Sequence, residues 1–269
     1  MRLAAPRRLA LWIVFSLALV LPSACWAQNA LIVHDGTAGI EADALGNLTT
    51  KLVAAGYTVT PSVGVPGGSL ATYGQVWDIR FNNTTPLTGA DITAYMTYLS
   101  GGGSLFVMGE NVGFATRNTS IVSLISTAGG GNITLTTPTE PETVQAPFTG
   151  PNAITSVTFL AADGSGFPGT GTFITRDAGG IGAALVWGPG NLAPAMTGTL
   201  IVVFDVNFLQ AGADAASQSL TNNMIAFLAA PVPVAPLIPL PPSLVLVLIG
   251  VGGVAFSELR RRRKSRVAA

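Results

Sequence analysis

The chain has 269 residues, 49% of them hydrophobic, and a mean hydropathy of +0.53, which is high for a soluble protein and indicates membrane-directed segments. The formal net charge is zero, yet residues 28 to 236 contain only four basic residues, Lys51, Arg80, Arg117 and Arg176, against twelve acidic ones. Isolated cations cannot form the basic patch that nucleic-acid binding needs, so nucleic acid is excluded as a partner. Cations, neutral glycans and protein surfaces are compatible with this acidic segment.

The first 27 residues have the pattern of a secretory signal peptide. Arginines precede an apolar run from Leu9 to Leu21, and small residues follow from Ala24 to Ala27. Cleavage there starts the mature protein at Gln28. Two alternatives stay open: an uncleaved anchor, although the run is short for a span, and lipidation at Cys25, the only cysteine.

Residues 28 to 230 alternate short apolar runs with amphipathic stretches, which predicts one exported α/β domain with a mainly parallel sheet. Its first part predicts strands at 30–34, 57–63, 76–81 and 104–108, and helices at 42–55, 88–100 and 119–128. Beyond Gly129 the composition shifts to Thr, Pro, Gly and Val, which predicts an antiparallel, loop-rich insertion with strands at 133–136, 157–160, 171–175 and 183–187. A strand at 199–204 and a helix at 213–228 close the domain.

The C-terminal segment has the features of a membrane anchor. Alternating prolines in residues 231–242 favour an extended linker, and an apolar segment at 243–259 predicts a transmembrane helix. The basic tail at 260–269 holds the C-terminus in the cytoplasm by the positive-inside rule, so the domain lies outside. The stop signal consists of Arg260, Arg261, Arg262, Arg263 and Lys264.

The sequence Ile238-Pro239-Leu240-Pro241, a short glycine-containing apolar helix and an arginine cluster together resemble the PEP-CTERM sorting signals, in particular their Val-Pro-Leu-Pro variants. The resemblance covers about the last 30 residues. It implies an exosortase as partner, a membrane transpeptidase that removes the tail and passes the protein to the outer envelope or an exopolysaccharide matrix. Leu240 stands where the eponymous motif has glutamate. A plain single-span anchor without processing is the alternative.

The exported domain resembles the class I glutamine amidotransferase-like superfamily, a flavodoxin-like fold, and especially its ThuA-like relatives. The matching features are the first strand, three glycines before the strand ending at Met108, and a late strand before Asp205-Val206-Asn207 and a helix. In catalytic members a nucleophile follows the central strand. Here Gly109-Glu110-Asn111 fills that position, which implies a domain without that nucleophile.

Oxygen-rich side chains follow several expected strands. Ligands of open α/β sheets bind at the carboxyl ends of the strands, so these groups could hold Ca²⁺ or a sugar. The alternative is that they are ordinary turn and cap residues. The candidate residues are His34, Asp35, Glu110, Asn111, Asp205 and Asn207. No cofactor is expected, and the sequence leaves a metal undecided.

Two functions from different classes follow. The first is a non-enzymatic envelope or matrix protein, linked to exopolysaccharide or biofilm; it is favoured because a lone His34 and a mature chain without cysteine offer no acyl-transfer machinery. The alternative is a membrane-anchored hydrolase or carbohydrate-active enzyme, in which Glu110 and either Asp35 or Asp205 act as acid and base.

Overall fold

The computed structural model describes residues 28–36, 38–193 and 196–229. The expected signal peptide, linker, membrane span and basic tail lie outside these residues. In the part of the chain that is described, no helix is long and apolar enough to cross a membrane.

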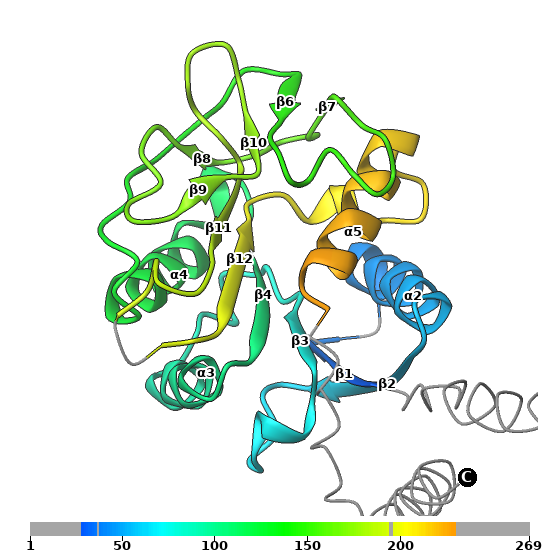
Figure 1. The fold of residues 1–269 in the computed structure, drawn as a ribbon, viewed down its shortest axis with the longest axis vertical. Coiled ribbons are helices and arrows are strands. Elements are labelled where there is room, and N and C mark those ends of the chain that lie inside the picture. The colour runs from blue at the N-terminus through cyan, green and yellow to red at the C-terminus, as the bar shows by residue number, and fades with distance from the viewer. Residues whose placement is uncertain (1–27, 37, 194–195, 230–269) are drawn as a thin grey trace, which may run out of the picture. The chain divides into compact units, whose positions relative to one another are not determined.

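A seven-stranded sheet forms the centre of the domain, in the order β2-β1-β3-β4-β12-β11-β9 (Figure 1). The parallel strands are β1 (Gln28–His34), β2 (Tyr57–Val63), β3 (Gln75–Asp78), β4 (Ser104–Met108) and β12 (Thr199–Val203); β11 (Ala184–Trp187) and β9 (Thr172–Phe173) are antiparallel. Numbered along the chain, the parallel strands have the spatial order 2-1-3-4-5, which is the flavodoxin-like order. The predicted α/β class with a mainly parallel sheet is therefore confirmed.

Helices cover both faces of the sheet. The helices α2 (Gly39–Ala54) and α5 (Ala215–Phe227) lie on one face, and α3 (Gly89–Ser100) and α4 (Ala115–Thr127) lie on the other (Figure 1). Successive strand residues point to opposite faces, so Ile32 packs in the core under α2 and α5, while Leu31 and Val33 pack in the core under α3 and α4. Burial on both faces explains the nearly continuous apolar runs of these strands.

The helix α3 begins where its sequence predicts. The Thr88 hydroxyl accepts a hydrogen bond from the Asp91 amide at 3.1 Å, and the Asp91 carboxylate accepts one from the Thr88 amide at 3.0 Å, which completes a capping box. The residues of α3 that it buries against the sheet include Tyr95, Tyr98 and Leu99, and the Tyr98 hydroxyl donates to the Tyr73 carbonyl at 2.9 Å.

Several boundaries differ from the expectation: α2 begins at Gly39 instead of 42, the strand expected at 157–160 is β7 at 156–157, and the one expected at 171–175 is divided into β9 and β10. Two differences have a clear physical reason. The strand β3 ends at Asp78 instead of Phe81, because the Arg80 amide turns back to donate to the Asp78 carboxylate at 3.1 Å. The helix α4 begins at Ala115, four residues before the expected start at 119. Its first turn is capped from another loop, since the Asn83 side-chain oxygen accepts from the Thr116 amide at 3.0 Å.

The segment between α4 and β12 is β-rich, as predicted: β9 and β11 extend the central sheet, whereas β6, β7 and β10 lie beyond the carboxyl ends of the parallel strands (Figure 1). It contains a three-stranded sheet in the order β10-β6-β7 and a two-stranded sheet of β5 and β8. The strands are β5 (Leu135–Thr136), β6 (Glu142–Val144), β7 (Ser156–Val157), β8 (Gly164–Ser165) and β10 (Thr175–Arg176). The strands β6 and β8 were not predicted, because two or three residues are too few to show a period.

A buried glutamine fixes the end of α5 against the amino end of the sheet. The Gln75 side chain is fully buried, and its Nε2 donates to the Ile225 carbonyl at 2.9 Å and to the Tyr57 hydroxyl at 2.7 Å. Its Oε1 accepts from the Trp77 indole nitrogen at 2.9 Å. Each polar atom of this side chain is therefore satisfied, and the last turn of α5 is tied to β3.

Candidate functional site

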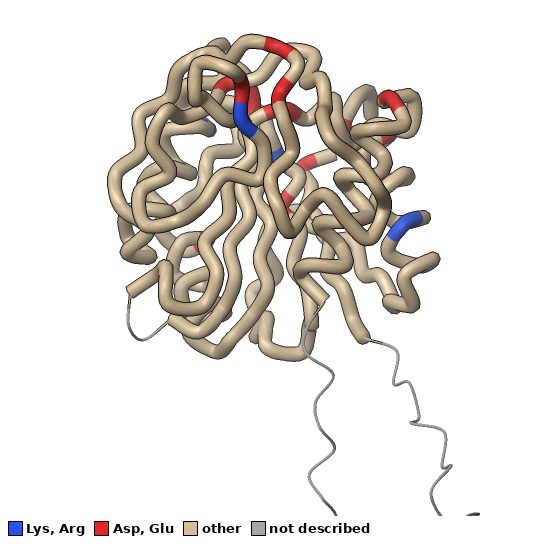
Figure 2. Tube along the Cα trace, turned by 45° about the horizontal axis from the view of Figure 1, so that its top comes forward, with Lys and Arg blue, Asp and Glu red and all other residues tan. Residues whose placement is uncertain are grey.

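The acidic residues lie mostly near the carboxyl ends of the parallel strands and in the segment beyond these ends (Figure 2). His34 ends β1 and Asp35 follows it; Glu110 and Asp205 each come two residues after the ends of β4 and β12. Open α/β sheets bind their ligands at this edge. The local contacts of each candidate decide whether its polar atoms are available to a ligand.

Glu110 is occupied by the backbone. It is 1% exposed; its Oε2 accepts from the Val206 amide at 2.8 Å, and its Oε1 accepts from the amide and side-chain nitrogen of Asn111 at 3.0 and 2.9 Å. Burial raises the pKa of Glu110 to about 7. A raised pKa is expected of a general acid, but here the carboxyl group joins the turn after β4 to η3 (Val206–Leu209).

Asp205 and Asn207 serve the next turn. Asp205 is fully buried, with Oδ1 accepting from the Asn207 amide at 2.8 Å and Oδ2 from the Leu160 amide at 2.7 Å. Burial raises the pKa of Asp205 above its ordinary value. The Asn207 side chain donates to Gln210 at 2.9 Å. Both residues thus act as cap and turn residues, in the way the alternative interpretation described.

His34 and Asp35 lie at the end of β1. His34 is 4% exposed, and its Nδ1 lies 2.9 Å from the Gly36 carbonyl. The Asp35 carboxylate accepts from the Thr85 hydroxyl at 2.8 Å. Burial acts to raise the pKa of Asp35, but hydrogen bonds with Glu41 and Thr85 and the charges of two arginines lower it below its ordinary value.

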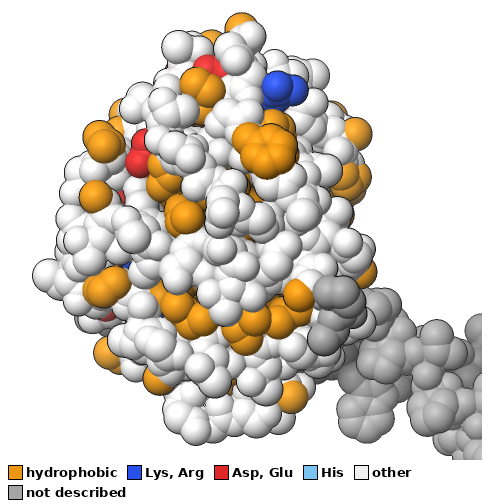
Figure 3. Space-filling view, turned by 90° about the vertical axis from the view of Figure 1, so that its left-hand side faces the viewer, with side chains coloured by type: hydrophobic (Ala, Val, Ile, Leu, Met, Phe, Trp, Pro, Cys, Tyr) orange, Lys and Arg blue, Asp and Glu red, His pale blue; other side chains and the backbone are white. Residues whose placement is uncertain are grey.

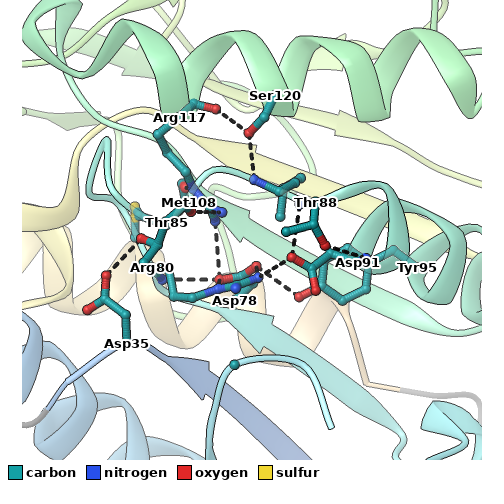
Figure 4. Close-up of polar contacts among 12 residues, drawn as sticks. Asp35, Asp78, Arg80, Thr85, Thr88, Asp91, Tyr95, Met108, Arg117 and Ser120 are labelled. Atoms are coloured by element: carbon teal, nitrogen blue, oxygen red, sulfur yellow. Dashed lines mark hydrogen bonds and ion pairs between the residues drawn. The ribbon is translucent and has the colours of Figure 1, made fainter. Parts of the chain in front are cut away.

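A buried charge cluster that the sequence analysis missed lies beside these residues (Figure 4). Asp78 is fully buried at the end of β3; its Oδ2 lies 2.7 Å from Arg80 Nη2 and accepts from the Tyr95 hydroxyl at 2.8 Å. Its Oδ1 lies 3.1 Å from Nη2 of Arg117, which is also fully buried. Arg80 additionally lies 3.5 Å from Asp91. Two acids and two arginines make the cluster electrically neutral.

The remaining contacts of the cluster hold separate elements together. Arg117 on α4 donates through Nε to the Met108 carbonyl and through Nη1 to the Thr85 carbonyl, both at 3.1 Å. Its Nη2 makes the ion pair with Asp78 without hydrogen-bond geometry. Burial acts to raise the pKa of Asp78, and the arginine charges and hydrogen bonds hold it below its ordinary value. The cluster therefore joins β3, β4, α3 and α4 at the edge where ligands of such sheets bind.

One signal in the sequence could have revealed this cluster. Asp78 and Arg80 interrupt the apolar run that predicts one strand at 76–81, and two of the four basic residues between positions 28 and 236 lie in or near predicted elements. Charged residues at such positions are seldom buried unless they are paired. Which partners they find depends on the sheet order, which the sequence alone does not give.

The turn after β4 does not have the geometry of a nucleophile elbow. Such an elbow presents its nucleophile on a strained strand-to-helix turn, but no described residue other than glycine has a positive φ angle. In the described part of the chain, no group of three or more His, Cys, Asp or Glu side chains is placed to hold a metal ion. The six predicted site residues lie at the carboxyl edge of the sheet. Four of them are engaged in local hydrogen bonds: Glu110, Asn111, Asp205 and Asn207.

The close packing of this turn gives a first prediction. A Cβ atom on Gly109 would lie 2.4 Å from Phe204 Cδ1 and 2.9 Å from Asn118 Oδ1. We expect Gly109→Ala to lower the free energy of unfolding by about 1–3 kcal/mol, as overpacking does. Urea unfolding followed by tryptophan fluorescence measures it. Gly46→Ala in α2, where a Cβ meets nothing within 4 Å, is the control and should not destabilise; equal effects at the two positions would contradict the packing argument.

Solved structures share the fold of this chain at low sequence identity. No protein-family profile and no curated protein matches the chain. Among solved structures, the mmIFT52 N-terminal domain matches 75% of this chain and 98% of its own, with 12% identity and a TM-score of 0.54. At this identity the likeness shows the fold alone.

Two further solved structures are more distant. The exo-β-1,4-mannosidase Op5Man5 from Opitutaceae bacterium strain TAV5 covers 76% of this chain and 36% of its own, at 13% identity and a TM-score of 0.47. A ThuA-like protein from Parabacteroides merdae covers 76% of this chain and 90% of its own, at 9% identity and a TM-score of 0.47. This chain thus spans about a third of the mannosidase, and both likenesses are too loose to carry a functional argument.

Proposed function

We propose that the protein is an exported, non-enzymatic component of the cell envelope or extracellular matrix, sorted by an exosortase through its C-terminal signal and associated with exopolysaccharide. The observation that carries the proposal is the pair of sorting signals, residues 1–27 and 231–269, on either side of one α/β domain. A leader, a proline-rich linker, an apolar segment and a basic stop are together what an exported and then sorted protein requires.

The state of the candidate site supports a non-enzymatic role. Glu110 and Asp205, two of the carboxyls that a hydrolase would use, have both oxygens engaged by backbone amides. A catalytic acid or base needs an oxygen within hydrogen-bond reach of its substrate. We further propose that the domain is a glutamine amidotransferase-like fold in which Gly109-Glu110-Asn111 replaces the nucleophile, on the strength of the 2-1-3-4-5 strand order and the unstrained turn after β4.

The charge distribution of the surface supports a neutral partner. Most charged residues of the described part are buried: Glu41, Asp78, Arg80, Asp91, Glu110, Arg117, Glu142, Asp163, Asp177 and Asp205. The helices α3 and α4 expose no charged side chain, and the side of the molecule in Figure 3 is mostly uncharged, with charged atoms near its top and left edge. A surface of hydroxyl, amide and scattered apolar groups suits an uncharged polysaccharide better than a charged polymer, whose binding needs opposite charges.

The proposed sorting gives a second prediction. We expect the protein recovered from its native envelope or matrix to have lost residues 1–27 and the segment beyond the motif near Pro241. Changing Pro239 and Pro241 together to alanine should leave the basic tail attached, because the sorting enzyme no longer finds its motif. Intact-mass measurement of both proteins tests this.

Two further outcomes separate the alternatives. The matched control changes Pro231 and Pro233 to alanine, which alters the same linker outside the motif and should leave processing unchanged. A native protein that retains its basic tail would exclude exosortase sorting and favour a simple membrane anchor. In that case hydrolysis of glycosides by the native protein, and its loss in Glu110→Gln, would support the enzyme alternative.

A further inference from the structure

The two edges of the central sheet differ in length. At one edge β9 has two residues, Thr172–Phe173, whereas β2 at the other edge has seven, Tyr57–Val63. In the part of the chain that the structure describes, β2 pairs only with β1. An edge strand presents unpaired N–H and C=O groups to any other extended chain, and a very short strand presents few of them. The edge that offers a long row of such groups is therefore β2.

The strand β2 lacks the charged side chains that often protect a sheet edge. Its sequence is Tyr-Thr-Val-Thr-Pro-Ser-Val, and only Tyr57 of these residues is buried. Val63, at the end of the strand, is 74% exposed. Uncharged segments with Thr, Val and Tyr have a high tendency to pair as strands. The residue of β2 that departs from this pattern is Pro61.

The hydrogen bonds on the two sides of β1 show how the backbone of β2 is oriented. The Gly64 amide donates to the His34 carbonyl at 2.9 Å, so the amide of residue 64 points toward β1. On the other side of β1, the Ile79 amide donates to the Val33 carbonyl at 2.9 Å. Successive residues of β1 thus bond to opposite neighbours, as expected of a strand inside a parallel sheet.

The same alternation runs along β2. Counting back from Gly64, the amides of Ser62 and Thr60 point toward β1, and those of Val59 and Val63 point away from it. Position 61 also points away, and proline has no N–H. The outer edge of β2 therefore lacks a donor between its two outward amides, which is where an edge strand tolerates proline.

We propose that Pro61 keeps β2 from pairing with β2 of a second copy of this chain. Two copies related by a two-fold axis would bring the same strand together with itself in antiparallel orientation, and each outward amide would need a carbonyl on the other copy. Pro61 removes one donor from each copy. Its Cδ also occupies the place of the missing hydrogen, where the second strand has to approach.

Since β2 carries no charge, Pro61 is the residue within the strand that leaves the edge unpaired. Copies of the domain that are held at high local concentration then stay separate. This role concerns the folded domain alone, and it does not depend on the proposed sorting.

The experiment compares the full chain, in detergent, with Pro61→Thr. Threonine suits an extended strand and restores the outward N–H, so we expect the fold to persist. The wild type should sediment as a monomer at every protein concentration, whereas the variant should associate, with a dimer fraction that rises several-fold as the concentration is increased. Sedimentation velocity measures the association. The fluorescence of the buried Trp77 shows whether the variant is folded.

Two further variants separate strand pairing from general aggregation. Pro66→Thr makes the same replacement in the loop after β2 and should leave the chain as monomeric as the wild type. Adding Val63→Lys to Pro61→Thr places a charge on the same edge. It should reverse the association, because the two lysines of a two-fold pair repel each other.

Hydrogen–deuterium exchange at single amides tests the geometry in the wild type itself. After correction for intrinsic rates, the amides of Val59 and Val63 should exchange several-fold faster than those of Thr60 and Ser62, because they face outward. The proposal is wrong if the wild type protects the amides of Val59 and Val63, or if folded Pro61→Thr stays a monomer. Equal association of Pro61→Thr and Pro66→Thr would also overturn it.

Discussion

Asp78→Asn should destabilise the domain more than any surface change. The carboxylate of Asp78 is fully buried and lies 2.7 Å from Arg80 Nη2 and 3.1 Å from Arg117 Nη2. Asparagine fits the space but carries no charge. The two buried guanidinium groups are then left with Asp91, which lies 3.5 Å from Arg80, as their counter-charge. Removing one partner from a buried ion pair typically costs about 3–5 kcal/mol.

For a domain of this size, such a loss lowers the unfolding temperature by roughly 10 °C. Thermal unfolding followed by tryptophan fluorescence measures it, because Trp77 and Trp187 are both fully buried. The control is Asp43→Asn in α2, where asparagine can still accept from the Ala211 amide. We expect that variant to unfold within about 1 kcal/mol of wild type. If Asp78→Asn were as mild, the cluster would contribute little to holding β3, α3 and α4 together.

The second large effect is a fall in stability as the pH rises from about 5 to about 8. Burial raises the pKa of Glu41 to about 8 and the pKa values of Glu110 and Glu142 to about 7. The folded protein therefore holds protons that the unfolded chain has released above pH about 4.5. This contribution is fully present below the unfolded pKa and is lost as the pH rises through the folded values. Since one pKa unit corresponds to about 1.4 kcal/mol, the combined loss is several kcal/mol.

Acid acts on other groups in the opposite direction. The pKa values of Asp35, Asp78 and Asp177 lie below their ordinary values, so their contribution is present above pH about 4 and lost below it. We expect the unfolding temperature to be highest near pH about 5, and Glu110→Gln or Glu142→Gln to flatten its decline toward pH about 8. Unfolding temperatures measured across this range test both expectations. A stability that is constant or rising between these values would contradict the protonated state of the buried glutamates.

The sequence predicted the class of fold well because its signals are local. The runs that became β1, β4 and β12 are buried on both faces, and the capping box at Thr88 marks the start of α3. The failures arose from distant contacts. The start of α4 depends on a cap from Asn83, more than thirty residues earlier in the chain, and no local pattern contains that information.

The sequence predicted where in the fold the candidate residues lie, but it did not predict which charged residues form the buried cluster there. The rule that ligands bind at the carboxyl ends of strands led to Glu110 and Asp205, which the structure engages in turns. The same rule does not reveal the pairing of Asp78 with Arg117, because these residues meet only after the sheet has been assembled in its non-sequential order. The contact between Asp35 and Glu41 was missed for a different reason: the expected helix began at residue 42, so Glu41 fell in the loop before it, whereas α2 begins at Gly39.

The buried side chain of Gln75 has a mechanical consequence. Any load on the chain beyond Ala229 enters the domain through the end of α5, where the Ile225 carbonyl is bonded to Gln75 and this side chain is in turn bonded to Trp77 and Tyr57. Tension at that point is transmitted through Gln75 to β3 and through Tyr57 to β2, so these bonds oppose separation of the helix from the sheet. A pull on the end of α5 therefore acts on the hydrogen bonds of two strands as well as on the helix itself.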